Sequence, residues 1–337
     1  GPQGIGFPDS SVHVRMNLGS VRMKLIIKES LYVPFTIASS AAGILLEKYD
    51  SRINAGCSGD AAVLVLLGGF SMAARADNVS RVDHDGVTLV EGATSDVRFA
   101  FTERAGGVSE DAYSSLNLGS HVGDDPFAVQ ENRRRALEAM GAAECEHNLL
   151  VPNQVHGDHV VTVTSNGADD LENIREWIAE GCDAIVCTAH EVPVLLCFAD
   201  CVPVVLVAPG GFAVVHSGWK GTIARISAKA CQALCEAAGC KPEDISAYIG
   251  PHILGDEYEV SQELMDRFAA EFACIDAAAS RMLDLSAAIR EALVDSGVDV
   301  NGIVDTKLST VRQNDRFYSY RNEGGTCGRH AAIGVML

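Results

Sequence analysis

From residue 86 onward, short apolar runs recur along the chain, separated by glycine, proline and aspartate. Short apolar or alternating runs are typical of strands, whereas apolar positions about three or four residues apart indicate helices. Predicted strands outnumber helices and several are joined by tight turns, which favours an α+β fold over a doubly wound parallel sheet. The pattern predicts strands at 88–90, 97–101, 182–188, 192–198, 202–207, 212–216, 245–249, 303–305 and 331–336, and helices at 126–140, 222–238, 261–272 and 286–294.

Two β-hairpins follow from this pattern, one turning at His156-Gly157-Asp158 and one at residues 208–211. In an antiparallel hairpin that turns at 208–211, His216 lies across from residue 203 or 204. Cys201 is only two or three residues earlier, so this hairpin brings a thiol close to an imidazole. The paired strands would be 148–155 with 159–163, and 202–207 with 212–216.

Residues 1–80 differ in composition from the rest of the chain. They hold seven Lys and Arg and six Asp and Glu, whereas the remaining residues carry a net charge of about −20. We therefore expect an extension of unknown role over 1–80, compatible with a vector-derived or disordered segment, and one folded domain over 81–337. Apolar stretches at 31–46 and 61–74 are shorter than the roughly 20 residues that cross a bilayer. Residues 61–76 resemble a signal peptide but start too far from the N-terminus.

Charge and cysteine usage narrow the range of partners. The 337 residues include 26 Lys and Arg and 45 Asp and Glu, which gives a net charge of −19. Such an acidic chain argues against a nucleic-acid partner, which needs a basic patch. Eleven cysteines are too few for a disulfide scaffold of this size. Several, such as Cys187 and Cys197, lie inside apolar runs, which predicts reduced, buried thiols and a cytoplasmic protein.

Three residues are candidates for metal binding or catalysis. His156 lies at the first predicted turn, Cys201 at a strand edge, and His216 at the end of a strand. Three nitrogen and sulfur ligands without a fourth match a catalytic zinc site, in which water or substrate takes the open position. The alternative at this point is a metal-free pair, with Cys201 as nucleophile and His216 as base.

Other segments are candidates for anion binding. The loop at 217–221 carries Lys220 and leads into the helix predicted from Thr222, and a lysine beside a helix N-terminus favours an anion. Two further polar segments contain Arg104, Asn117 and Arg321, which are candidates for phosphate or substrate contacts. No Gly-x-Gly-x-x-Gly follows a predicted strand and no Walker loop is present, which argues against NAD and ATP sites of those kinds.

Taken in order, these motifs resemble those of the YfiH-like family, also called multicopper polyphenol oxidoreductases or laccase-domain proteins. The resemblance covers about residues 85–337 and leaves 1–80 without a counterpart. One departure is Cys327, where many members run directly from Thr to Gly. The matching stretches are 104–109, 115–119 with 121–125, 153–157, 183–186, 199–203, 216–221, 249–253 and the tail around Gly328-Arg329.

The resemblance implies a mixed β-sandwich flanked by helices, related to the catalytic domain of a Cys–His bacterial toxin deamidase. It implies that a transition metal is bound by His156, Cys201 and His216. It also implies purine nucleoside chemistry, namely phosphorolysis of adenosine, inosine, guanosine and methylthioadenosine, and deamination of adenosine. The expected partners are these nucleosides and phosphate, with Zn²⁺ as the cofactor and Cu²⁺ as the alternative, since His₂Cys suits both metals.

Three other functions stay open at this stage. Copper-dependent polyphenol oxidation is one, although multicopper oxidases need paired histidine motifs and no His-x-His occurs among the ten histidines. A metal-free Cys–His hydrolase is another. A non-catalytic partner-binding module is supported only by the extension over 1–80. The sequence leaves the preferred nucleoside, the metal and the oligomeric state undetermined.

Overall fold

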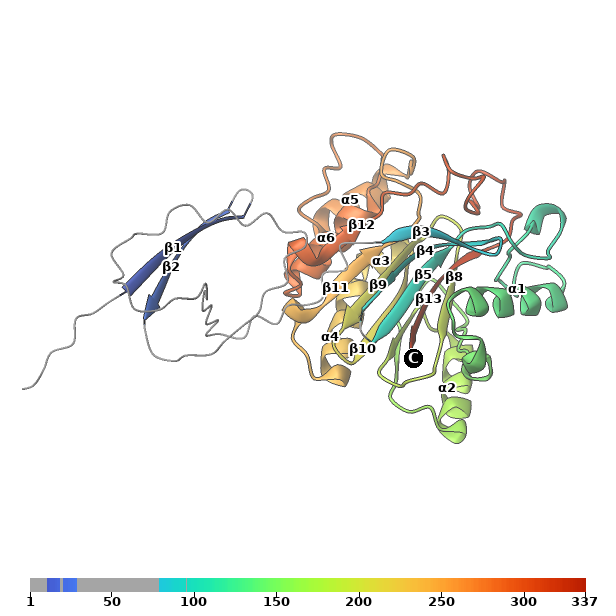
Figure 1. The fold of residues 1–337 in the computed structure, drawn as a ribbon. Coiled ribbons are helices and arrows are strands. Elements are labelled where there is room, and N and C mark those ends of the chain that lie inside the picture. The colour runs from blue at the N-terminus through green and yellow to red at the C-terminus, as the bar shows by residue number, and fades with distance from the viewer. Residues whose placement is uncertain (1–10, 19–20, 29–78, 95) are drawn as a thin grey trace, which may run out of the picture. The chain divides into compact units, whose positions relative to one another are not determined.

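A computed structural model describes residues 11–18, 21–28, 79–94 and 96–337 (Figure 1). The chain divides into two compact units, Gly1–Ser71 and Met72–Leu337. In the first unit, β1 (Ser11–Leu18) and β2 (Val21–Lys28) form an antiparallel hairpin. The apolar stretches at 31–46 and 61–74 and the leader-like segment at 61–76 lie outside the described residues. Within the described ranges, none of the helices has the length and hydrophobicity of a membrane span.

The second unit contains two β-sheets. One sheet has six strands and is mixed, because its first and last strand pairs are parallel and the others antiparallel. The other has five strands and is antiparallel throughout. In spatial order, the six-stranded sheet is β12 (Ile303–Asp305), β11 (Ser246–Ile249), β9 (Val202–Ala208), β10 (Gly211–Ser217), β7 (Ala184–Cys187) and β6 (Val160–Val163). The five-stranded sheet is β3 (Ser80–His84), β4 (Val87–Ala93), β5 (Val97–Thr102), β13 (His330–Met336) and β8 (Val194–Phe198).

The two sheets pack against each other through a shared apolar core. Phe99 of the five-stranded sheet and Phe212 and Tyr248 of the six-stranded sheet belong to this core. Gly334 of β13 permits the close approach, since a Cβ there would lie 2.6 Å from the Phe212 ring. Cys187 belongs to the same core and is a buried free thiol, as predicted from its apolar run. The fold is therefore α+β, as the pattern of apolar runs indicates.

Helices flank both sheets (Figure 1). Residues of α4 and α6 pack with β9, β10 and β11 in a second apolar core, and α1 packs with β4, β5 and β13 in a third. The helices are α1 (Pro126–Ala139), α2 (Ala168–Glu180), α3 (Trp219–Ile223), α4 (Ile226–Ala238), α5 (Gln262–Glu271) and α6 (Leu285–Asp295). Short 3₁₀ turns are η1 (Asp111–Tyr113), η2 (Ala143–Asn148), η3 (Pro242–Asp244) and η4 (Val300–Gly302).

The predicted β9–β10 hairpin is confirmed. Its register pairs His216 with Pro203, one of the two positions expected from the turn at 208–211. Two of the predicted helices are confirmed as well, and each begins at a side-chain cap. The Asp125 carboxylate accepts a hydrogen bond from the backbone N–H of Phe127 at the start of α1, and the Ser261 hydroxyl accepts one from Leu264 at the start of α5.

The predicted hairpin over 148–163 is wrong. Residues 149–155 form only an isolated bridge, between Leu150 and Val194, and β6 pairs in parallel with β7. The backbone N–H groups at the turn donate instead to the carboxylate of Asp183, which replaces cross-strand pairing as their partner.

Two predicted helix starts also need correction. The helix expected over 222–238 is split into α3 and α4, because Arg225 adopts a left-handed conformation with φ of 57°. The N-cap of α6 is Asp284 and not Ser286, since the Asp284 carboxylate accepts the backbone N–H of Ala287. The pattern of apolar residues also failed to predict α2 and β3.

We expect a chain that lacks residues 1–78 to fold and to keep its activity. The cut must lie before β3, because Arg81 pairs with the buried Glu103 (2.7 Å), which also binds Arg316 (2.6 Å). Thermal denaturation, metal content and activity of the shortened chain would be compared with those of the full chain. An insoluble product, or lost activity at unchanged metal content, would show that the removed segment belongs to the fold.

Candidate functional site

The structure brings His156, Cys201 and His216 together at the open end of the β9–β10 hairpin. One ligand atom from each lies within 4.8 Å of the other two. The His156 and His216 rings are 4.9 Å apart between centroids and meet at 77°. His216 is buried, Cys201 is half-buried and His156 is exposed, so the group is reached from the His156 side.

The buried carboxylate of Asp183 holds both histidines in place. One of its oxygens accepts hydrogen bonds from Nδ1 of His216 (2.7 Å) and from the backbone N–H of His156 (3.0 Å). The other accepts the N–H groups of Val155 (3.2 Å) and Gly157 (2.8 Å). These bonds support the left-handed backbone of His156, whose φ is 58°. Because Nδ1 of His216 is engaged, its Nε2 remains for a ligand, as in carboxylate–histidine–metal arrangements.

Charge at this site favours a thiolate beside an imidazolium when no metal is bound. Burial disfavours the charged form of Cys201, but the positive charge of His216 and hydrogen bonds from His156 and His216 outweigh it and lower the pKa of the thiol to about 6. Burial likewise disfavours a charged His216, but the Cys201 thiolate and the Asp183 carboxylate raise its pKa to about 9. Asp183 is buried too, yet hydrogen bonding to His216 holds the pKa of its carboxyl below the usual value.

Gly218 leaves room for a ligand beside the three side chains. A Cβ at this position would lie 3.1 Å from Sγ of Cys201 and 3.4 Å from Cδ2 of His156. Two imidazoles and a thiolate are ligands that zinc and copper both accept. Donor chemistry, mutual spacing and the absence of a side chain at Gly218 therefore all fit a transition-metal ion held by three protein ligands.

The electrostatics predict an unusually reactive thiol in metal-free protein. After chelation, Cys201 should be alkylated by iodoacetamide with a midpoint near pH 6, because the thiolate is the nucleophile. Cys274 is a matched control, since it is exposed but burial and Glu291 raise its pKa to about 12. Mass spectrometry of alkylated peptides from about pH 5 to about pH 10 would follow both thiols, and Cys274 should stay largely unmodified over this range. A Cys201 midpoint near 9, unchanged in His216→Ala, would contradict the ion pair.

Asp200 connects the site to the C-terminal segment. It precedes Cys201 with φ of 101°, a strained value for a non-glycine residue. One carboxylate oxygen accepts the hydroxyls of Thr310 and Ser319, both at 2.7 Å, and the other accepts the backbone N–H of Arg321 (2.8 Å). Residues 310–321 are thereby fixed next to Cys201.

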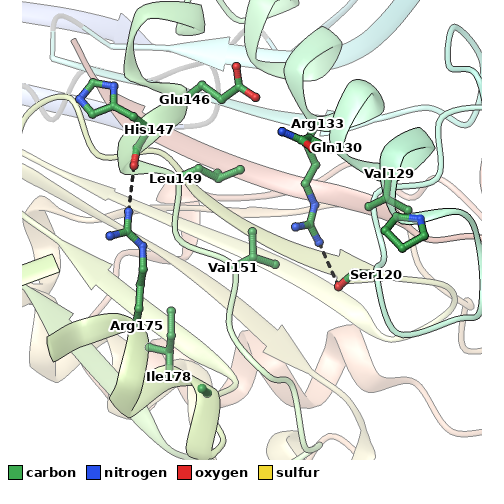
Figure 2. A pocket seen from close by; sticks show the side chains of 12 residues that line it. Ser120, Val129, Gln130, Arg133, Glu146, His147, Leu149, Val151, Arg175 and Ile178 are labelled. Carbon is green, nitrogen blue, oxygen red and sulfur yellow. Dashed lines mark hydrogen bonds between the residues drawn. The ribbon is translucent and has the colours of Figure 1, made fainter. Parts of the chain in front are cut away.

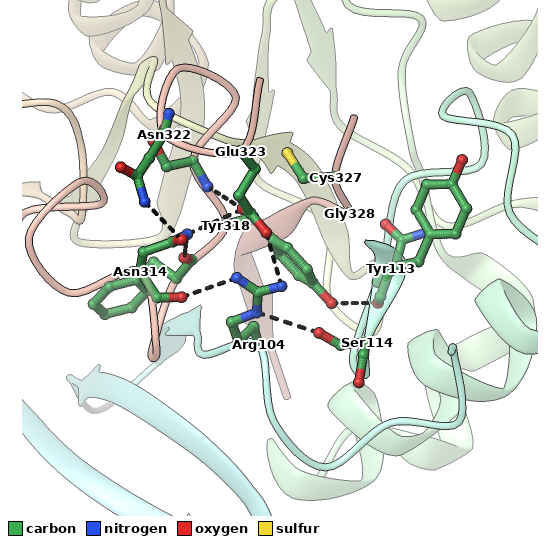
Figure 3. A network of polar contacts seen from close by, with 12 residues as sticks. Arg104, Tyr113, Ser114, Asn314, Tyr318, Asn322, Glu323, Cys327 and Gly328 are labelled. Atoms are coloured by element: carbon green, nitrogen blue, oxygen red, sulfur yellow. Dashed lines mark hydrogen bonds and ion pairs between the residues drawn. The ribbon is translucent and has the colours of Figure 1, made fainter. Parts of the chain in front are cut away.

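Arg104 and Asn117, two of the residues considered for substrate binding, make contacts within the protein. The Arg104 guanidinium pairs with Glu323 (3.0 Å), donates to the carbonyl oxygens of Ser114 and Asn314, and lies 4.2 Å from the Tyr318 ring centroid (Figure 3). Asn117 is fully buried, and its side-chain amide is hydrogen-bonded to Gly119, Asp124 and Arg329. Both side chains thus support the loops around the site, and their role in substrate binding stays a prediction.

Lys220 and Arg321 are exposed. Lys220 lies in α3 with Nζ 5.5 Å from the Trp219 ring centroid, and α3 has only five residues. Arg321 stacks over Tyr258 at 5.0 Å. Burial and the negative charge of Cys201 raise the pKa of the Tyr258 hydroxyl, and the backbone N–H of Arg321 donates to Asp200, the residue before the candidate ligand Cys201. Of these two residues, Arg321 is therefore the one that the structure connects to the site.

A separate cavity of about 610 Å³ lies between α1, η2 and α2 (Figure 2). Arg133 donates to Ser120 on one side of it, and Arg175 donates to the carbonyl oxygen of His147 on the other. None of the three metal-ligating candidates lines this cavity. The three candidate ligands thus lie outside this cavity, whereas Arg133 is part of its wall.

Sequence reasoning missed the roles of Asp183 and Asp200. Asp183 falls inside the run predicted as a strand over 182–188, where a single carboxylate among apolar residues is itself a signal of a buried polar contact. Asp200 stands next to Cys201, but its partners are more than a hundred residues away in sequence. No local pattern indicates such long-range hydrogen bonds.

Comparisons with known proteins show which family this chain belongs to. A family model described as multi-copper polyphenol oxidoreductase laccase matches residues 98–337. The chain is 36% identical over 256 residues to a purine nucleoside phosphorylase of Deinococcus radiodurans, a match that covers 74% of this chain and 92% of that protein. It is 33% identical over 241 residues to adenosine deaminase RL5 from an unknown prokaryotic organism, covering 68% of this chain and 90% of that protein.

The fold agrees with a solved structure as well. The crystal structure of the hypothetical protein YfiH from Bacillus licheniformis superposes with a TM-score of 0.67 at 28% sequence identity. The superposition covers 76% of this chain and 98% of that one. The two sheets and their flanking helices are thus an arrangement shared with this crystal structure.

Proposed function

We propose that this chain, which belongs to the multi-copper polyphenol oxidoreductase laccase family, catalyses phosphorolysis of purine nucleosides and deamination of adenosine. The proposal draws on its similarity, over most of its length, to a purine nucleoside phosphorylase and an adenosine deaminase. The substrates are adenosine, inosine, guanosine and methylthioadenosine, with phosphate as the second substrate of phosphorolysis. The observation that carries the proposal is the convergence of His156, Cys201 and His216 within 4.8 Å.

We assign Zn²⁺ to these three side chains. Three protein ligands with an open position are the arrangement of catalytic zinc sites, and Cu²⁺ is the alternative because it binds the same donors. When bound, zinc supplies a Lewis acid that activates water near neutral pH. Cys201 would hold the metal as the thiolate that its lowered pKa favours, and Asp183 would keep Nδ1 of His216 protonated and leave Nε2 for the metal.

The two reactions use different nucleophiles at different atoms of the nucleoside. In deamination, water attacks C6 of the purine and ammonia leaves. In phosphorolysis, a phosphate oxygen bonds to C1′ of the ribose while the bond from C1′ to N9 breaks, through an oxocarbenium-like transition state. The nucleoside approaches from the side of the exposed His156, and Arg321 above Tyr258 is a candidate contact there.

A copper polyphenol oxidase is the second candidate, favoured by the description of the family model. Oxidases of this kind hold several coppers through paired histidines. Across the described residues, His156, Cys201 and His216 form the one group of three or more close metal-binding side chains. Oxidation of phenols would thus have to run on a single three-ligand site.

Incubation of the purified enzyme with inosine or adenosine, with and without phosphate, tests the proposal directly. From inosine, we expect hypoxanthine and ribose 1-phosphate only when phosphate is present. From adenosine without phosphate, we expect inosine. Chromatography follows the products of both reactions. Metal analysis of the same preparation separates zinc from copper and from a metal-free Cys–His hydrolase. Phenol oxidation without any turnover of nucleosides would refute the proposal in favour of the second candidate.

A further inference from the structure

Two arginines beside the site carry charges that no carboxylate neutralises. Among the described residues, Arg133 and Arg329 form no ion pair, unlike Arg104, which pairs with Glu323. Nε of Arg133 donates to the carbonyl oxygen of Leu118 (3.0 Å). Nη1 of Arg329 donates to the carbonyl oxygens of residues 327 and 328, both at 2.9 Å. Both side chains are half-buried, so solvent screens their charges less than it would on an open surface and an anion near them is attracted more strongly.

The two arginines converge on the segment 117–121. The backbone N–H of Leu118 donates to the carbonyl oxygen of Arg329 (2.9 Å), and the same Leu118 accepts the hydrogen bond from Arg133. A Cβ on Gly119 would lie 2.8 Å from Cγ of Arg329 and 3.3 Å from Cε1 of His121. His121 therefore lies beside Arg329, and the lack of a side chain at Gly119 allows this close approach.

This cluster lies next to the metal ligands. His330 pairs with Phe198 across β13 and β8, so Arg329 is adjacent to the segment that leads into Cys201. The Phe198 ring is 5.4 Å from the ring of His216. Partial burial of the His121 ring lowers its pKa, and so do the positive charges of Arg329 and Arg133.

Asp124, three residues after His121, does not neutralise the cluster. Asp124 accepts hydrogen bonds from the Ser109 hydroxyl (2.5 Å) and the Asn117 amide (2.9 Å), and it forms no ion pair with either arginine in the described part of the chain. Among the described residues, Arg133 and Arg329 thus keep guanidinium charges that no ion pair neutralises, in a chain of net charge −19. Guanidinium groups whose N–H groups are not all hydrogen-bonded within the protein are the usual protein partners of phosphate.

We propose that Arg133, Arg329 and His121 form the subsite for the phosphate that attacks the nucleoside, in place of the loop at 217–222. The inference rests on the proposed phosphorolysis. With HPO₄²⁻ as nucleophile, an oxygen lone pair forms the new bond to C1′ and the electron pair of the C1′–N9 bond leaves with the base. The proton of the phosphate balances the step by passing to the base, which yields ribose 1-phosphate and the neutral purine.

The test compares Arg329→Gln, Arg133→Gln and Lys220→Met in the zinc-loaded full chain. We expect each arginine variant to raise the apparent KM for phosphate about 10- to 100-fold, because a charge-assisted hydrogen bond to the anion is lost. The KM for inosine should change far less, and Arg329→Lys should recover part of the affinity. Arg98→Gln is a matched control, since Arg98 also donates to a backbone carbonyl, that of Met140, without an ion pair among the described residues.

Stabilisation by phosphate supplies a readout that needs no turnover. Inorganic phosphate should raise the melting temperature of the wild type and of Arg98→Gln, but raise that of the two arginine variants much less. Wild-type phosphate affinity in both arginine variants would overturn the subsite, as would a loss confined to Lys220→Met. If the wild type itself cleaves inosine without phosphate, the proposed phosphorolysis fails, and that result is distinct from failure of the subsite.

Discussion

Replacing Cys201 or His216 by alanine is expected to abolish both phosphorolysis and deamination. Each variant removes one of three donors, and a site with two remaining ligands should lose most of its zinc at micromolar protein. Loss of the Lewis acid removes several kcal/mol of transition-state stabilisation, so activity should fall at least about a thousandfold. Chromatographic assays and metal analysis of the same purified samples would measure both effects.

Matched variants separate metal loss from general damage. Cys274→Ala removes an exposed thiol outside the trio, and His159→Ala removes an exposed imidazole three residues after His156 whose Nδ1 contacts the carbonyl oxygen of Gly181. Both should keep metal content and activity. Full metal occupancy in Cys201→Ala and His216→Ala would disprove the ligand assignment, and full activity would disprove the role of the metal in catalysis.

The hairpin that carries His216 could be predicted because its signals are local. Two apolar runs flank Ala208-Pro209-Gly210-Gly211, and the turn fixes which residues face each other, so the observed pairing of His216 with Pro203 follows from sequence. The predicted hairpin around His156 failed for the opposite reason. Its turn is shaped by Asp183, 27 residues from His156, and no local pattern shows that a distant carboxylate will capture the backbone N–H groups.

Candidate anion-binding residues show a similar limit. A positively charged side chain in a polar loop looks the same in sequence whether or not a carboxylate neutralises it. Glu323 pairs with Arg104 across more than two hundred residues, and Arg329 forms no such pair among the described residues. Sequence thus identifies the loops that border the site, whereas the distribution of charge among them depends on tertiary contacts.

Replacing Asp183 by asparagine is expected to damage stability and metal binding together. The carboxylate accepts four hydrogen bonds, from His216 and from the N–H groups of residues 155, 156 and 157. An amide has one acceptor oxygen, and its NH₂ group would face N–H donors that cannot accept. Leaving buried donors unpaired and removing the charge opposite His216 should lower the free energy of unfolding by about 2–5 kcal/mol. Metal affinity should fall about 10- to 100-fold, as for other partners of metal-ligating histidines.

Asp158→Asn is the matched control, because Asp158 lies in the same turn but is exposed and pairs with Lys229 at the surface. It should change stability by less than about 1 kcal/mol. Denaturant titration and competition with a zinc chelator measure the two quantities separately. If Asp183→Asn bound zinc as tightly as the wild type at reduced stability, Asp183 would support only the turn at 155–157. Because its carboxylate also bonds the imidazole of His216, we expect both quantities to fall in Asp183→Asn and neither to fall appreciably in Asp158→Asn.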